Sequence, residues 1–163
     1  MTHAAVVLVG HENHWFDYIL NPIRNIIRNE LDYGQCYISP KILHKSNISV
    51  RIWSSNAETI SYVQNQWTKR YAVDIFLYEI DKKGDERFYQ QFYRDIERIY
   101  QSLFENSIVQ TSAQHGNDAL IANKFYDGVV ENIIINDFNE GEEEIDGLNV
   151  CKFEFFVTLS RET

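Results

Sequence analysis

The final segment of the chain, Cys151–Ser160, alternates apolar and polar side chains: every odd position is apolar and most even positions are polar. A period of two over this length predicts a β-strand with one buried face. A similar run, Arg70–Ile80, precedes a long helical pattern and is expected to be a central strand. The resulting order of helix, two strands, helix and two strands restricts the chain to a mixed helix-and-sheet fold.

Two stretches carry the spacing of amphipathic helices. Between Phe16 and Leu31 apolar residues recur at intervals of three and four, which places them on one helix face. Pro22 either occupies the first helical position or kinks a helix already begun, and we expect a helix that is irregular before it. The second helix is expected over Glu86–Glu105. Its apolar stripe is Phe88, Phe92, Ile96, Ile99, Leu103 and Phe104, and its charged surface positions are Arg87, Arg94, Asp95, Arg98 and Glu105.

Two further alternating segments, Asn47–Ser54 and Val129–Phe138, complete the expected strands. Between the first two strands, Ser54–Gln66 reads as a turn followed by a short helical or irregular piece. The polar segment Ile108–Asn123 predicts a surface loop. We therefore expect an α+β fold, with an antiparallel sheet of about four strands and two main helices packed on one face, in the order α-β-β-α-β-β.

The composition is that of one packed domain. The 163 residues include ten Tyr, ten Phe and three Trp but only two Pro and seven Gly, which is unlike a disordered chain. We expect a single α+β domain over residues 16–163, with residues 1–15 as an N-terminal arm or irregular segment. The apolar stretch Ala4–Val9 is too short for a signal sequence or a membrane span, which predicts a soluble, non-secreted protein.

Charge argues against direct binding of nucleic acid. The chain carries 24 Asp and Glu against 15 Lys and Arg, a net charge of −9. Affinity for DNA or RNA comes mainly from Lys and Arg that displace counterions from phosphates. Cys36 and Cys151 lie far apart in the sequence, and buried free thiols are favoured over a disulfide for them.

No group of residues predicts catalysis, a metal or a cofactor. His11-Glu12-Asn13-His14 lacks the spacing of a helical zinc pair. No Gly-rich phosphate loop follows a strand, and no Ser stands in a nucleophile elbow. The acidic connection before the last strand lacks the turn glycine of a calcium loop, so it reads as a solvated hairpin tip or a surface that repels like-charged polymers. Its acidic residues of interest are Glu140, Glu142, Glu143, Glu144 and Asp146.

Aromatic residues outside the expected core imply a second buried surface. Tyr89 and Tyr93 widen the stripe of the long helix, whereas Phe76, Tyr78 and Phe156 lie on the nominally outer faces of their strands. Loops of the same chain provide one explanation for that surface. The other is a subunit interface, where Tyr, Phe and Trp are enriched.

Four segments together resemble the small tail terminator, or tail completion, proteins of long-tailed bacteriophages. They are Ile48–Trp53, Gln66–Ile75, the helix Glu86–Glu105, and Cys151–Arg161 with its ending Ser160-Arg161-Glu162. The resemblance lies in the order of the elements and in their richness in aromatic residues. It spans most of the chain from Phe16 onward.

The resemblance implies a non-enzymatic virion protein of the phage neck, present in the host cytoplasm during assembly. Subunits of that family form a ring, usually a hexamer, that caps the tail tube and meets the head connector or adaptor protein. The genome passes through the ring without specific DNA binding, and the acidic connection is a candidate for the channel lining or for a contact between rings. Alternatives are another neck component, such as a head completion or connector adaptor protein, or a cytoplasmic module that binds a small molecule or peptide.

Overall fold

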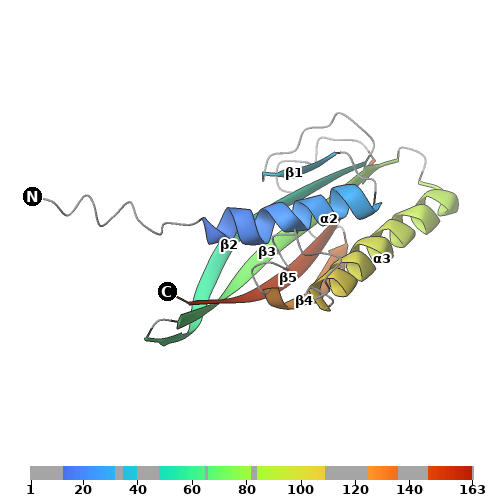
Figure 1. Ribbon diagram of the computed structural model, residues 1–163. Coiled ribbons are helices and arrows are strands. Elements are labelled where there is room, and N and C mark those ends of the chain that lie inside the picture. The colour runs from blue at the N-terminus through green and yellow to red at the C-terminus, as the bar shows by residue number, and fades with distance from the viewer. Residues whose placement is uncertain are drawn as a thin grey trace, which may run out of the picture.

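The computed structural model describes residues 13–31, 35–39, 48–64, 66–81, 84–108, 125–135 and 147–162 (Figure 1). The fold is α+β: helices cover one face of a mixed five-stranded sheet of order β1-β2-β3-β5-β4. The elements are η1 (His14–Leu20), α2 (Asn21–Leu31), β1 (Cys36–Ile38), β2 (Ile48–Val63), β3 (Gln66–Ile80), α3 (Glu86–Ile108), β4 (Phe125–Ile135) and β5 (Leu148–Glu162).

The expectation of about four antiparallel strands was wrong in one respect, because β1 adds a fifth strand that runs parallel to β2. The Val50 backbone N–H donates to the Gln35 carbonyl at 2.8 Å, and the Ser39 N–H donates to the Ile52 carbonyl at 3.0 Å. Three residues are too few to display a period of two, so the strand is created by its pairing with β2 rather than by a local sequence signal.

The segment after Trp53 is strand, which corrects the expected turn and irregular piece over Ser54–Gln66. β2 continues to Val63 and pairs with β3 as a long hairpin, which projects beyond the helices (Figure 1). Its polar residues do not alternate with apolar ones because none of the described helices covers this end of the sheet, and most side chains from Ser55 onward are exposed. Backbone pairing with β3 therefore determines its conformation.

The first helix is irregular before Pro22, as the sequence predicts. Residues His14–Leu20 form a π-helix, and the Asn21 backbone N–H donates to the Phe16 carbonyl five residues earlier. Pro22 has no backbone N–H, so one helical hydrogen bond to the preceding turn is missing. The wider turn of the π-helix before Pro22 reduces the effect of this missing bond. His14 and Trp15, which we assigned to the arm, belong to this helix, and residues 1–12 lie outside the described residues.

The main core lies between the helices and the odd-numbered residues of the two central strands. β3 and β5 pair without a register shift from Gln66 opposite Glu162 to Ile80 opposite Leu148, which confirms β3 as a central strand. The buried helix residues include Phe92, Ile96, Ile99 and Leu103, as predicted.

Two side chains of α3 differ from the prediction. Phe104 is exposed although it was assigned to the apolar stripe, and Asp95 is buried although it was assigned to the surface. Asp95 follows Phe92 by three positions and precedes Ile99 by four, and residues at these spacings share one helix face. Within the described residues, no helix has the length and hydropathy needed to cross a membrane.

Candidate subunit interface

Two of the candidate interface residues are buried within the single chain. Phe76 and Tyr78 are 1% and 2% exposed and form a second apolar cluster with Val150 on the sheet face opposite the helices. The indole of Trp53 stacks on the Phe76 ring with centroids 4.5 Å apart and planes 7° from parallel. The outer aromatic residues at this end of the sheet thus fill an intramolecular cluster, and they are not open to a neighbouring subunit.

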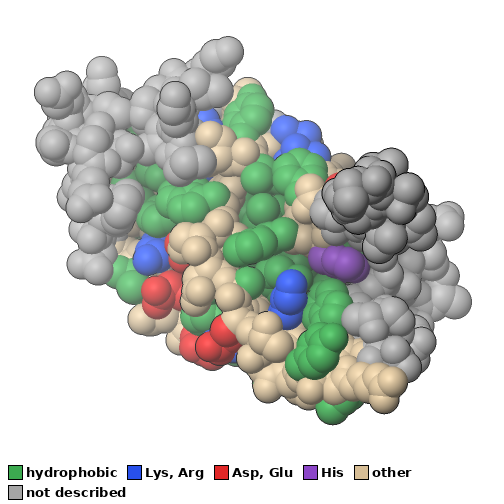
Figure 2. Space-filling model, turned by 90° about the vertical axis from the view of Figure 1, so that its left-hand side faces the viewer, with side chains coloured by type: hydrophobic (Ala, Val, Ile, Leu, Met, Phe, Trp, Pro, Cys, Tyr) green, Lys and Arg blue, Asp and Glu red, His purple; other side chains and the backbone are tan. Residues whose placement is uncertain are grey.

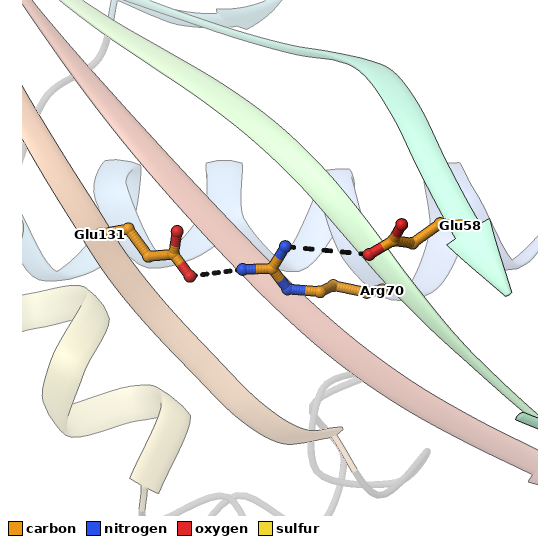
Figure 3. Close-up of polar contacts among 3 residues, drawn as sticks. All are labelled: Glu58, Arg70 and Glu131. Carbon is orange, nitrogen blue, oxygen red and sulfur yellow. Dashed lines mark hydrogen bonds and ion pairs between the residues drawn. The ribbon is translucent and has the colours of Figure 1, made fainter. Parts of the chain in front are cut away.

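Phe156 lies farther along the same face, beneath an arginine that joins four strands. The Arg70 guanidinium on β3 lies 3.8 Å above the centroid of the Phe156 ring on β5. Its two terminal nitrogens contact carboxylates on either side: Glu58 on β2 at 4.0 Å, and Glu131 on β4 through a hydrogen bond (Figure 3). One side chain therefore connects the two outer long strands across the central pair.

The sheet face opposite the described helices, which we call the helix-free face, carries further charges beside Arg70. Asp74 lies directly opposite Glu154 in the β3–β5 register, and the Lys152 ammonium is 3.5 Å from the Glu154 carboxylate. Burial raises the pKa of Asp74, and the positive charge of Lys152 opposes that shift. Four carboxylates, Glu58, Asp74, Glu131 and Glu154, share this face with three cations, Arg70, Lys152 and the buried Arg51 opposite Phe76, which leaves an excess of one negative charge.

The remaining candidates, Tyr89 and Tyr93, lie on α3 and therefore on the other side of the sheet. Tyr93 is 54% exposed. Tyr89 is partly buried, and its hydroxyl donates to the Asn149 side-chain oxygen at 3.5 Å. The structure thus divides the five candidates between two opposite faces and brings only Phe76, Tyr78 and Phe156 onto one of them.

A further apolar surface lies at the tip of the β2–β3 hairpin. Ile60, Tyr62 and Val63 are all more than half exposed, and Tyr62 reaches 71%. Figure 2 views the molecule from the hairpin end and shows hydrophobic side chains gathered across its surface, with acidic groups toward one side. This surface could not be predicted from the alternation of apolar and polar residues, because that alternation ends at Ser54.

A pair of buried carboxyl groups joins α3 to the sheet. Glu79 on β3 and Asp95 on α3 are hydrogen-bonded to each other, and both are almost fully buried. One oxygen of each, Glu79 Oε2 and Asp95 Oδ2, has no partner if both groups are ionised. Asp95 Oδ1 accepts from the Gln91 amide at 2.9 Å and lies 3.8 Å from an Arg98 nitrogen.

A single proton shared by the two carboxyl groups accounts for this geometry. Burial, followed by the hydrogen bond and the negative charge of Asp95, raises the pKa of Glu79 from 4.5 to about 9. Glu79 is therefore neutral at pH 7 and donates to Asp95. The alternation of β3 contained a signal for this pair, because Glu79 occupies an odd position in a strand whose odd positions face the core.

The cysteines match their prediction, since Cys36 and Cys151 are buried free thiols. Burial raises the pKa of each to about 12. His14 packs edge-on against Tyr18 and Trp67, with ring centroids 5.2 Å apart in both pairs. Among the described residues no cluster of three or more metal-ligating side chains occurs. His11, Glu12 and the acidic connection lie outside the described residues.

Comparison with known proteins adds no relative to this description. The chain matches no protein-family model, and a search of curated proteins gives no match.

Proposed function

We propose that this chain is a structural virion protein of a bacteriophage neck. Its subunits form a ring, hexameric by the resemblance, that terminates the tail tube and joins it to the head connector. The observation that carries the proposal is the helix-free face of the long sheet, where an arginine-centred ladder of charges spans four strands. The proposed role assigns no chemistry to any side chain.

The charge of the helix-free face supports its use as a channel wall. Its described charged side chains carry one more negative than positive charge, as counted above. A wall with this sign repels DNA weakly and opposes adhesion of a passing genome. The acidic connection Glu140–Asp146 remains a candidate for the same lining or for a contact between rings.

The shape of the sheet supports curvature. β2 is shifted in register between Trp53 and Asn56 and again between Thr59 and Ser61, whereas β3 and β5 pair without a shift. β4 carries two shifts of the same kind against β5. Bulges bend the strand that contains them and increase its twist, and they are the usual means of curving a sheet toward closure.

The alternative of a small-molecule or peptide module is less well supported. It requires the outer aromatic residues to line an open pocket, yet Phe76 and Tyr78 are almost fully buried against Trp53 and Val150. Another neck component, such as a head completion or connector adaptor protein, has the same structural requirements as a tail terminator.

Electron microscopy of the purified protein at high concentration tests the proposal. We expect annular particles with a central hole, and a strictly monomeric protein at every concentration would refute the assembly. Immunolabelling of phage particles then separates the neck components. A tail terminator is retained on finished tails that lack heads, whereas a head completion protein is retained on tailless capsids.

A further inference from the structure

We infer that neighbouring subunits associate by pairing the open edge of β2 on one copy with the open edge of β4 on the next, with Arg70 offsetting part of the negative charge of the two edges. The inference rests on the proposed function, because it specifies the contact that builds the ring. The open edge of β2 is Ser54–Val63, and the open edge of β4 is Val129–Ile135.

The open edge of β2 contains two register shifts but lacks the Lys and Pro residues that commonly block an edge strand. In the described part of the chain, β1 pairs with β2 only at Val50–Ile52, and no strand pairs with the outer side of Ser54–Val63. Its side chains from Glu58 onward are exposed. Natural edges are commonly blocked by Lys or Pro, and this stretch contains neither of them and no Arg.

The open edge of β4 has the same character. β4 is the last strand of the sheet, and among the described strands it pairs only with β5. Val129 and Ile133 are large apolar side chains that are exposed at this edge. The stretch Val129–Ile135 also contains no Lys, Arg or Pro.

Strand direction makes the two edges complementary. β2, β3, β5 and β4 are successively antiparallel, so β2 and β4 run in opposite directions within one copy. A second copy related by rotation about an axis along the strands therefore presents its β2 antiparallel to the first copy's β4. The sheet continues from copy to copy with no change in its hydrogen-bonding pattern.

The register adds a stagger to this contact. Val129 is level with Phe156 and thus with Ala72, the residue opposite Asn56. From that level, the open edge of β2 extends toward Gln66, whereas the open edge of β4 extends toward Leu77. For the two open edges to overlap fully, neighbouring copies must be displaced relative to each other along the strands. In closed barrels, strands tilted to the barrel axis are staggered in this way.

Arg70 halves the negative charge that would oppose this contact. The open edge of β2 contains one charged residue, Glu58, and the open edge of β4 contains one, Glu131. Both carboxylates contact the guanidinium of Arg70 in their own subunit. Without that cation, two strands that each carry a negative charge would approach one another, and like charges on paired strands are destabilising.

Pairing β2 with β4 also uses both edges of every copy. A two-fold pair of β2 edges would leave β4 open, and a two-fold pair of β4 edges would leave β2 open. The unlike pairing repeats with a single kind of contact, and a repeated head-to-tail contact closes into a ring or extends as a filament.

Two edge variants test the inference in the full chain. The β2 variant is Ile60→Lys with Tyr62→Lys, and the β4 variant is Val129→Lys with Ile133→Lys. The replaced side chains are exposed, and circular dichroism and thermal melts verify that each variant folds. Sedimentation velocity then measures the assembly of each variant alone and of an equimolar mixture.

We expect each variant alone to be monomeric, because each has lost one of the two unlike edges. Their mixture should form a one-to-one heterodimer and nothing larger, since only one intact contact remains possible between them. A variant that forms a ring or a homodimer, or a mixture that stays monomeric, overturns the inference.

Tyr93→Lys tests the rival interface on α3, because Tyr93 is 54% exposed and lies away from both edges. It should assemble as the wild type does. If Tyr93→Lys abolishes the ring while the edge variants retain it, the edge contact is wrong but the proposed function stands. A monomeric wild type at high concentration refutes both.

The role of Arg70 has a separate readout. Arg70→Gln should weaken assembly by about tenfold, equivalent to about 1.4 kcal/mol. Adding Glu58→Gln and Glu131→Gln to that variant should restore assembly, because the edges then carry no charge. Failure of this restoration in a folded triple variant contradicts the assigned role.

Discussion

At the scale of single residues, the most unusual feature is the carboxyl pair of Glu79 and Asp95 between β3 and α3. A buried carboxylate without compensation is costly, but one proton shared between two carboxyl groups leaves a single negative charge. Gln91 and Arg98 both approach Asp95 Oδ1, whereas the oxygen of Asp95 without a further partner is Oδ2. The pair thus joins helix to sheet through a protonated acid.

Glu79→Gln should reduce the loss of stability at alkaline pH. Between pH 4.5 and about 9, native Glu79 retains a proton that the unfolded chain has released, so the free energy of unfolding falls as pH rises. This contribution has a slope of at most about 1.4 kcal/mol per pH unit. Glutamine keeps a donor for Asp95 but does not titrate, so urea unfolding from pH 5 to pH 9 should show a flatter profile.

Glu97→Gln is the control for this experiment, because Glu97 is exposed on the same helix. It should keep the wild-type dependence on pH. A Glu79→Gln variant whose unfolding free energy declines with pH as steeply as that of the wild type would show that Glu79 does not hold the proton.

At the scale of elements, the sheet combines a regular centre with irregular outer strands. β3 and β5 pair in unbroken register, whereas β2 and β4 each contain two register shifts against them. Arg70 reaches from the centre to both outer strands and lies on the Phe156 ring. It therefore couples strands whose backbone pairing with the centre is interrupted.

A double-mutant cycle on Arg70→Ala and Glu131→Ala should measure this coupling. The carboxylate is half exposed, and partly exposed ion pairs contribute about 0.2–1 kcal/mol. We expect a coupling free energy of about 0.5 kcal/mol in urea unfolding, smaller at about 1 M salt because the charges are screened. The cycle of Arg70→Ala with Glu97→Ala, on the other side of the sheet, should show none. Equal coupling in both cycles would exclude a specific contact.

At the scale of the whole molecule, charge governs behaviour toward nucleic acid. The net charge of −9 and the acidic excess of the helix-free face have the same sign. A protein that surrounds a moving genome benefits from weak repulsion on every side, because each attractive phosphate contact would slow transit.

The purified protein should therefore not bind duplex DNA in fluorescence anisotropy at about 50 mM salt, where phosphate contacts are stronger than at about 200 mM. Lowering the salt further should not produce binding, since no counterions are released when acidic surfaces approach DNA. Binding that weakens steeply as salt is added would reveal a cationic surface and would argue against a passive channel.

The fold class followed from periodicity. Cys151–Ser160, Arg70–Ile80 and the stripe from Phe92 to Leu103 each repeat at a spacing that only one secondary structure satisfies, and each is confirmed. These elements carry the core, so their own side chains record which face is buried.

Tertiary structure alone decided the rest of the described fold. β1 and the second half of β2 are strands because a neighbouring strand satisfies their backbone groups, and side-chain patterns do not encode that pairing. Phe76 and Tyr78 looked like interface residues because alternation distinguishes two sheet faces but does not show whether both are covered. Arg70 meets Glu58 and Glu131 only after four strands lie side by side, since contacts between residues distant in sequence leave no periodic trace.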